Sequence, residues 1–190
     1  MQPEVLIAYV TRSGSTEDVA EAMGLTMQEA GIPVDVKPMV DVESISDDTS
    51  VILGAALYVG HFPKEFHRFV VRFQRELGNE RPWIFALGPT ERDPKHFLAA
   101  EDQVRKELAK YPWIHPADVR VIGGSFDPHH LKLPFPFSIV MKLPGNPMRK
   151  LPPSDIRDWD WIRAWARSIA EYLNRGGSTA RVDSSIHRDS

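Results

Sequence analysis

The sequence lacks cysteine, long hydrophobic runs and an excess of basic residues, and each absence excludes a class of protein. Without cysteine, the 190-residue chain has no disulfides, thiolate metal sites or cysteine nucleophile, which fits a reducing compartment. No apolar run approaches the ~18 residues of a membrane-spanning helix, and the start of the chain does not resemble a signal peptide. The net charge of −3 argues against nucleic-acid binding. We therefore expect a cytoplasmic protein.

The remaining composition is that of a folded domain, with 42% hydrophobic and 26% charged residues. A chain of this length is expected to form one domain, which we assign to residues 1–174. Residues 175–190 begin Arg-Gly-Gly-Ser and carry few apolar side chains, so we expect them to be disordered.

A short polar loop at residues 11–16 directly follows the apolar run 5–10. The run suits a buried parallel strand, and the spacing of Val19, Met23 and Met27 predicts a helix after the loop. Strand, loop and helix in this order build an anion site, because unpaired amides and the positive end of the dipole lie at the helix start. The hydroxyls of the loop add uncharged donors. The loop therefore predicts a phosphate site; its residues are Thr11, Arg12, Ser13, Gly14, Ser15 and Thr16.

A simpler interpretation is that Thr16 only caps the helix. A cap needs one hydroxyl, whereas this loop has four and a glycine, so we favour the phosphate interpretation.

Strands and helices alternate along the rest of the chain. We expect five short buried strands, at residues 5–10, 34–36, 51–55, 83–87 and 119–122, and the alternation in 34–36 suggests that this strand is an edge. Helices are expected from Thr16, from Pro63 to about Leu77, from Pro94 to Leu108, and over 162–173 after an Asp155 or Asp158 cap. Such a chain builds a parallel sheet with helices on both faces, in the order 2-1-3-4-5.

Loops at the carboxyl ends of three strands then meet at one crevice, at the switch point between the first and third strands. They are residues 11–16, 56–62 and 88–93. The first loop lacks the lysine of a nucleotide P-loop and the three glycines of a dinucleotide site. It also lacks the carboxylates with which a receiver domain binds a divalent ion.

The pattern Thr-x-Ser-Gly-Ser-Thr at 11–16 resembles the FMN phosphate loop of flavodoxins, and the resemblance extends over residues 4–174. Within that superfamily, the chain looks most similar to the flavodoxin-type, menaquinone-dependent protoporphyrinogen oxidases. The segment Gly54 to His61 resembles a segment of that family, as do Ile122-Gly123-Gly124 with the insertion after them and Asp158-Trp159 before the last helix. The resemblance implies a flavodoxin-like three-layer α/β sandwich with an insertion, 126–153, after the fifth strand.

The resemblance also implies FMN as cofactor, with the phosphate held by residues 11–16. Tyr58 is then the aromatic residue expected to stack on the isoalloxazine ring, although a tyrosine that only closes the sheet is the simpler alternative. His61 is either a proton relay to the ring or a solvent-facing residue at a helix start. The two walls of the ring site are Leu57, Tyr58, Val59, Gly60 and His61 on one side and Gly88, Pro89 and Thr90 on the other.

The insertion 126–153 is apolar, broken by prolines, and flanked by basic residues. It is either a lid on its own domain or a segment that covers the flavin, holds an apolar acceptor, contacts a membrane surface peripherally, or forms a dimer contact. Adjacent His129 and His130 are poorly spaced for joint coordination, so we predict no metal site.

Three functions remain open at this point. The first is an FMN-dependent oxidoreductase that passes electrons from a reduced substrate, protoporphyrinogen by resemblance, to a quinone-like acceptor. The second is an electron carrier that has no substrate of its own and exchanges electrons with a redox partner protein. The third is a degenerate fold without flavin. The sequence identifies no catalytic side chain, because the flavin itself performs the redox chemistry.

Overall fold

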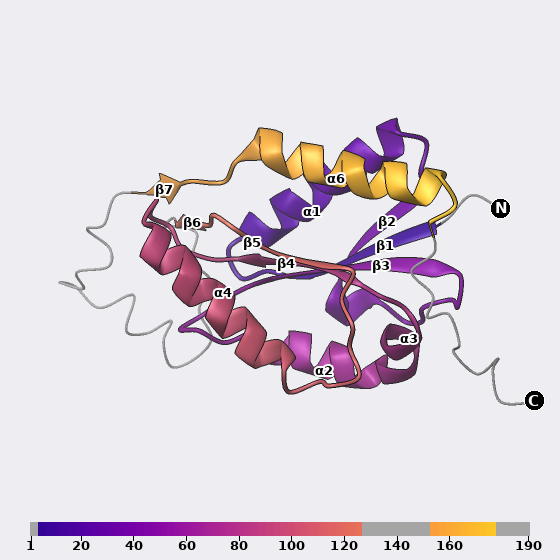
Figure 1. The fold of residues 1–190 in the computed structure, drawn as a ribbon, viewed down its shortest axis with the longest axis horizontal. Helices are drawn as coiled ribbons and strands as arrows, with labels where there is room; N and C mark the ends of the chain where they lie inside the picture. Colours follow the sequence, from indigo (N-terminus) through magenta and orange to yellow (C-terminus); the bar gives the residue numbers. More distant parts are fainter. Residues whose placement is uncertain (1–3, 127–152, 178–190) are drawn as a thin grey trace, which may run out of the picture.

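The computed structural model describes residues 4–126 and 153–177, built around a parallel sheet in the order β2-β1-β3-β4-β5 (Figure 1). This order and the parallel pairing confirm the predicted topology. The strands are β1 (Glu4–Val10), β2 (Val34–Pro38), β3 (Thr49–Ala56), β4 (Trp83–Leu87) and β5 (Asp118–Ile122).

Burial of the strands follows their place in the sheet. β1, β3 and β4 lie inside it, and nearly every residue in them is buried because both faces are covered. β2 and β5 are the edges. The edge predicted for 34–36 is confirmed, since β2 is the first strand of the sheet and its residues are at best half-buried. The prediction of a buried strand is wrong for β5, where Val119 and Arg120 are exposed.

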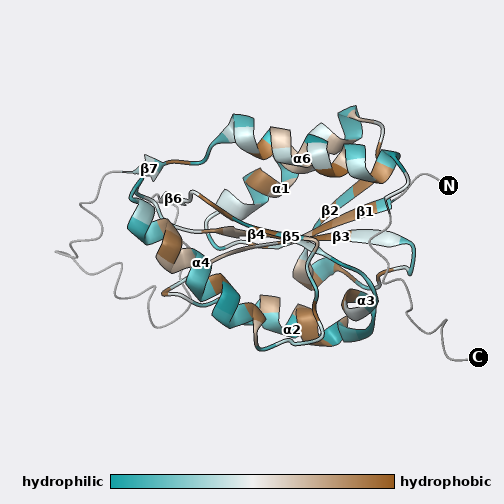
Figure 2. Ribbon diagram, viewed as in Figure 1, coloured by the Kyte–Doolittle hydropathy of each residue, from teal (hydrophilic) through white to brown (hydrophobic). Residues whose placement is uncertain are grey.

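Helices cover both faces of the sheet and make the chain a three-layer sandwich (Figure 1). Helices α1 (Ser15–Glu29) and α6 (Trp159–Asn174) share a hydrophobic core with one face. The opposite face packs against α2 (Lys64–Arg72), α3 (Gln74–Asn79) and α4 (Pro94–Leu108). Hydrophobic residues of the helices turn toward the brown strands between the layers, and polar residues face outward (Figure 2).

Three local features differ from the prediction. The expected single helix from Pro63 is two helices, because Phe73 leaves helical geometry at φ −105°, ψ 34° and divides α2 from α3. Pro63 itself is extended and precedes the helix. A short 3-10 helix, η1 (Met39–Asp41), follows β2.

A small antiparallel pair also forms beyond β5, where the sequence predicted only an insertion. It joins β6 (Ser125–Phe126) to β7 (Ser154–Asp155). Asp158 caps α6 by accepting from the Trp161 amide at 3.0 Å, which decides between the two predicted caps.

Several predictions fall outside the described residues. They concern the insertion at 127–152, with His129 and His130, and the end of the tail at 178–190. Within the described residues, no helix is both long and apolar enough to cross a bilayer.

Close packing inside the sheet depends on Gly54 of β3. A Cβ atom built there would lie 2.2 Å from the Phe85 ring, and Phe85 is fully buried on β4. The sheet therefore accepts only glycine at position 54 unless the phenylalanine moves.

Gly54→Ala is expected to lower the free energy of unfolding by about 1–3 kcal/mol through overpacking. Urea denaturation of the purified variant measures this loss. In the same chain, Phe85→Leu should restore part of the stability, because the smaller side chain leaves room for the methyl group. Equal stability of Gly54→Ala and the parent would contradict the packing argument.

Candidate functional site

The candidate site lies where the carboxyl ends of the strands meet. All five strands run in one direction, so the loops after β1, β3 and β4 emerge at the same edge of the sheet (Figure 1). The sheet order reverses between β1 and β3, whose outgoing loops lead to helices on opposite faces. Open α/β sheets bind their ligands at such a point.

The loop after β1 prepares the start of α1 for an anion. Gly14 adopts a left-handed conformation (φ 90°) and occupies the capping position, and no side chain caps the helix there. The cap that we considered for Thr16 is therefore absent. The Gly14 amide instead donates to Thr11 Oγ1 at 2.9 Å, which closes the loop on itself. A Cβ at Gly14 would meet no atom within 4 Å, so the space in front of the loop is open.

Thr16 provides the most informative single atom of the loop. Its side chain is fully buried at the start of α1, and its Oγ1 has no hydrogen-bond partner. A buried hydroxyl without a partner carries a desolvation cost that native proteins rarely leave uncompensated. Ser13 and Ser15 lie beside it, with their hydroxyl oxygens 3.3 Å apart. The loop therefore contains a desolvated hydroxyl whose hydrogen-bonding capacity is unused.

Arg12 connects the first loop to the second. Its guanidinium lies 5.5 Å from the centre of the Tyr58 ring and 3.5 Å from Glu65 Oε2 on α2. Burial raises the pKa of the half-buried Tyr58 hydroxyl, although the charge of Arg12 opposes the change. The structure thus brings Arg12 and Tyr58 together. The charge of Arg12 is paired with Glu65.

The second loop contains a tight two-residue turn. Tyr58 and His61 exchange backbone hydrogen bonds of 2.9 and 3.1 Å, and Val59 and Gly60 between them both have positive φ, at 51° and 79°. This is the pattern of a type I′ turn. Val59 is 99% exposed, so the tip of the turn projects into solvent, and the His61 side chain is also largely exposed.

The third loop is held against the end of β5. The Gly88 amide donates to Ile122 O at 2.8 Å, and the Gly124 amide donates to Pro89 O at 2.7 Å. A Cβ at Gly88 would lie 2.8 Å from Val121 Cγ1, so this position also requires a small residue. Gly88, Pro89 and Thr90 are all half-buried.

Two residues near these loops were not predicted. Arg157 reaches the loop 11–16, where its Nη1 donates to Ser15 O at 3.1 Å. The same atom donates to Asp18 of α1 at 2.9 Å, and Asp155 accepts from Nη2. Glu107 of α4 is buried behind the second loop and bonds His61 at 2.9 Å. A carboxylate beside Val104 and Leu108 on the apolar stripe of a helix was the available signal for Glu107.

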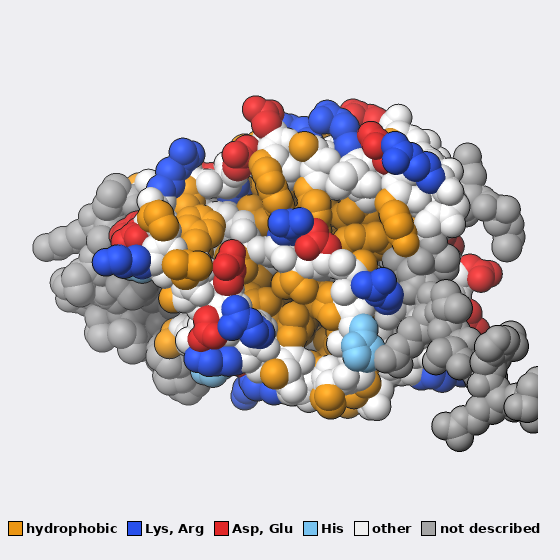
Figure 3. All heavy atoms as spheres, in the orientation of Figure 1, with side chains coloured by type: hydrophobic (Ala, Val, Ile, Leu, Met, Phe, Trp, Pro, Cys, Tyr) orange, Lys and Arg blue, Asp and Glu red, His pale blue; other side chains and the backbone are white. Residues whose placement is uncertain are grey.

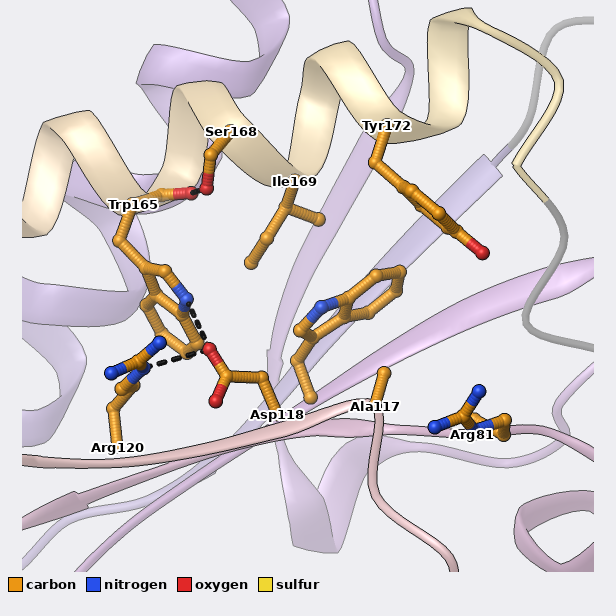
Figure 4. A pocket seen from close by; sticks show the side chains of 9 residues that line it. Arg81, Ala117, Asp118, Arg120, Trp165, Ser168, Ile169 and Tyr172 are labelled. Atoms are coloured by element: carbon orange, nitrogen blue, oxygen red, sulfur yellow. Dashed lines mark hydrogen bonds and ion pairs between the residues drawn. The ribbon is translucent and has the colours of Figure 1, made fainter.

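A second hollow lies at the opposite end of the sheet, between α6 and the starts of β4 and β5 (Figure 4). Its volume is about 310 Å³, and Trp83, Trp165 and Tyr172 line it. Its central polar groups bind one another: Asp118 accepts from Trp165 Nε1 at 3.1 Å and from Arg120 Nε at 2.7 Å. Hydrophobic side chains also gather on this side of the molecule, between α6 and α4 (Figure 3). The hollow lies at the amino ends of the strands, whereas the candidate site lies at their carboxyl ends, so the two are separate.

These observations define a doubly wound α/β protein with a hydroxyl-rich loop and an uncapped helix start at its switch point. Comparison with protein families then identifies the family: residues 6–134 match the model described as a flavodoxin domain, so the chain belongs to the flavodoxin-domain family. It is a flavodoxin-type redox protein, and membership indicates a flavin cofactor. No group of three histidine, aspartate or glutamate side chains suited to a metal ion occurs among residues 4–126 and 153–177.

Curated relatives match most of the chain. Protoporphyrinogen IX dehydrogenase [quinone] of Escherichia coli strain K12 is 25% identical over 182 residues, which cover 90% of this chain and 97% of that protein. A protein of the same name from Leishmania major is 25% identical over 174 residues, which cover 88% of this chain and 75% of the relative. The predicted resemblance to this group of oxidoreductases is confirmed.

Solved flavodoxins share the fold. A cysteine-to-serine mutant of flavodoxin from Pseudomonas aeruginosa has a TM-score of 0.56 at 12% identity, covering 90% of this chain and 99% of that one. Oxidised flavodoxin 1 from Bacillus cereus has a TM-score of 0.53 at 15% identity, covering 89% and 98%. The predicted flavodoxin-like fold is therefore confirmed.

The unpartnered hydroxyl of Thr16 leads to a stability test. Thr16→Val removes a buried hydroxyl that bonds nothing, so the ligand-free protein should become more stable by about 1 kcal/mol. Thr26→Val is the matched control on the same helix, since buried Thr26 donates to Ala22 O at 2.8 Å. The Thr26→Val substitution should lower the free energy of unfolding by about 1 kcal/mol. Thermal and urea unfolding measure both; an equal loss in the two variants would mean that Thr16 Oγ1 has a partner.

Proposed function

We propose that the chain is an FMN-dependent oxidoreductase that transfers electrons from a reduced substrate to a quinone-like acceptor. The observation that carries the proposal is the loop 11–16, with its uncapped helix start and the buried, unpartnered Thr16 hydroxyl. A terminal phosphate supplies the acceptor oxygens and the negative charge that such a site stabilises. The name shared by the curated relatives, protoporphyrinogen IX dehydrogenase [quinone], supports protoporphyrinogen as the substrate and a quinone as the acceptor.

The residues present fit FMN. Amides from Arg12 to Thr16 and the hydroxyls of Thr11, Ser13, Ser15 and Thr16 would bind the phosphate. The segment from Leu57 to His61, which contains Tyr58, would lie against one side of the ring. Gly88, Pro89 and Thr90 would lie against the other side. The space in front of Gly14 is open. The Gly14 amide and the Thr11 hydroxyl bond each other and would exchange that bond for bonds to the phosphate.

FMN, once bound, supplies the redox chemistry by taking up and releasing electrons. The side chains of this protein would orient the FMN and exchange protons with it. His61 Nδ1 is engaged by Glu107, so Nε2 is the nitrogen left to exchange a proton with the ring or with solvent. Residues 1–174 would form one FMN-binding domain.

The phosphate assignment is tested by comparing FMN with riboflavin, which lacks the phosphate. Two or more charge-assisted hydrogen bonds to the phosphate predict riboflavin binding at least about 100-fold weaker. Quenching of flavin fluorescence on titration with ligand-free protein measures both dissociation constants. Thr16→Val should weaken FMN binding about tenfold and leave riboflavin binding unchanged. Equal affinity for the two flavins would overturn the assignment.

Substrate oxidation is tested with the FMN-loaded protein, protoporphyrinogen and a menaquinone analogue under anaerobic conditions. The porphyrin product is fluorescent, and we expect its appearance to require both FMN and the quinone. A matched reaction without quinone controls for direct electron uptake by the flavin alone. An FMN-loaded protein that produces no porphyrin would instead favour the electron-carrier alternative, which the likeness to solved flavodoxins supports.

A further inference from the structure

We propose that Glu107 is a positioning residue for the flavin site: its carboxylate anchors the turn 58–61 on helix α4 in the conformation that faces the ring. The inference rests on the proposed function, because the turn matters only if a ring lies against it. Glu107 belongs to a different element from the three site loops, and its side chain is only 3% exposed. A carboxylate so deeply buried is rare unless it is paired.

Three donors bind this carboxylate and a fourth nitrogen lies beside it. Oε1 accepts from His61 Nδ1 at 2.9 Å and from the Lys110 ammonium, and Oε2 accepts from the Phe62 amide at 3.3 Å. His67 Nε2 lies 3.1 Å from Oε2. A carboxylate offers about four lone-pair positions, so most of its acceptor capacity is used. Burial would raise the pKa of Glu107, but the bonds from Lys110, His61 and Phe62 outweigh it and lower the pKa to about 2. Glu107 therefore remains ionised at neutral pH.

These groups come from elements that Glu107 joins together. His61 and Phe62 belong to the loop after β3, His67 lies on α2, and Lys110 follows α4. His67 Nδ1 also contacts the Tyr111 hydroxyl. The bond from His61 connects the carboxylate to the turn itself, and the bond from Phe62 connects it to the next residue along the chain.

The turn needs such an anchor because its own sequence disfavours its conformation. Val59 has φ 51°, a conformation in which a β-branched side chain is strained. Its side chain is 99% exposed, so it gains no packing to offset the strain. Asparagine or glycine is the usual residue at this position of a type I′ turn. The conformation is therefore imposed by contacts around Val59, and Glu107 supplies two of them.

Helix α4 reaches the turn at a second point one helical turn earlier. A Cβ at Gly60 would lie 3.0 Å from the Gln103 side chain, so the Gly60 backbone rests directly on it. Gln103 and Glu107 are four residues apart and lie on the same side of the helix. The turn is held by α4 through both side chains, and a preformed turn binds its ligand without the cost of ordering.

The test compares the ligand-free parent protein with Glu107→Gln, which keeps the size of the side chain and removes its charge. We expect the amides of Tyr58 and His61, which pair across the turn, to exchange hydrogen faster in the variant. FMN should bind about tenfold more weakly. NMR-detected exchange and flavin-fluorescence titration measure the two effects. Unchanged exchange of both amides in a folded variant would overturn the proposal.

His67→Ala is the matched control. It removes an imidazole that lies beside the Glu107 carboxylate, as His61 does. His67 is on α2, however, so its contact with Glu107 does not connect the carboxylate to the turn. We expect it to lower the melting temperature while leaving FMN affinity and the two amides unchanged. If FMN binding fell in both variants in proportion to the loss of melting temperature, Glu107 would be a general stabilising residue and the proposal would fail.

Val59→Asn provides a rescue. With Gly60 it creates the Asn-Gly pair that adopts this turn by itself. Added to Glu107→Gln, it should restore slow exchange of the His61 amide and recover most of the lost FMN affinity. Continued fast exchange in the double variant would show that Glu107 does not act through the turn conformation.

If Glu107→Gln does not fold, His61→Gln replaces it, because His61 is largely exposed and its substitution spares the other donors. The same faster exchange at Tyr58 is then expected, and its absence would overturn the proposal. FMN binding by the parent protein distinguishes a failure of the proposed function from a failure of this inference. A parent that binds no FMN refutes the flavin site, whereas the exchange measurements on the ligand-free chain still decide whether Glu107 anchors the turn.

Discussion

The parallel direction of all five strands is the constraint on which the site depends. A parallel sheet places every carboxyl strand end at one edge, and the reversal of order between β1 and β3 separates the loops that leave there. Loops far apart in the chain are thereby brought together: Arg12 lies over Tyr58, and Gly124 bonds Pro89.

Two ways of satisfying buried polar groups meet at this edge. Glu107 is bound by donors within the protein, whereas Thr16 Oγ1 has none. The first arrangement costs nothing further when a ligand arrives, since its bonds are already made. The second leaves hydrogen-bonding capacity unused. The proposed flavin site combines the two: an anchored turn beside the ring, and an unsatisfied hydroxyl in the loop expected to hold the phosphate.

Much of the fold was predictable because its signals are local. The apolar runs of β1, β3 and β4 and the spacing of Val19, Met23 and Met27 depend on neighbours in the chain, and both appear as expected. The break of the helix at Phe73 was missed, because the apolar stripe continues through it. The exposed middle of β5 was missed for a related reason: its apolar residues resemble those of a buried strand, and only the sheet order makes it an edge.

The sequence by itself determined the alternation of strands and helices and the position of the loop 11–16 after the first strand, because periodicity and loop chemistry are carried by adjacent residues. Only the tertiary structure decided what surrounds each side chain. It left Thr16 without a partner, turned Arg12 toward Glu65, and placed Glu107 behind the turn that contains Val59. His61 and Glu107 are separated by 46 residues, and their contact arises only when α4 packs against the loop after β3.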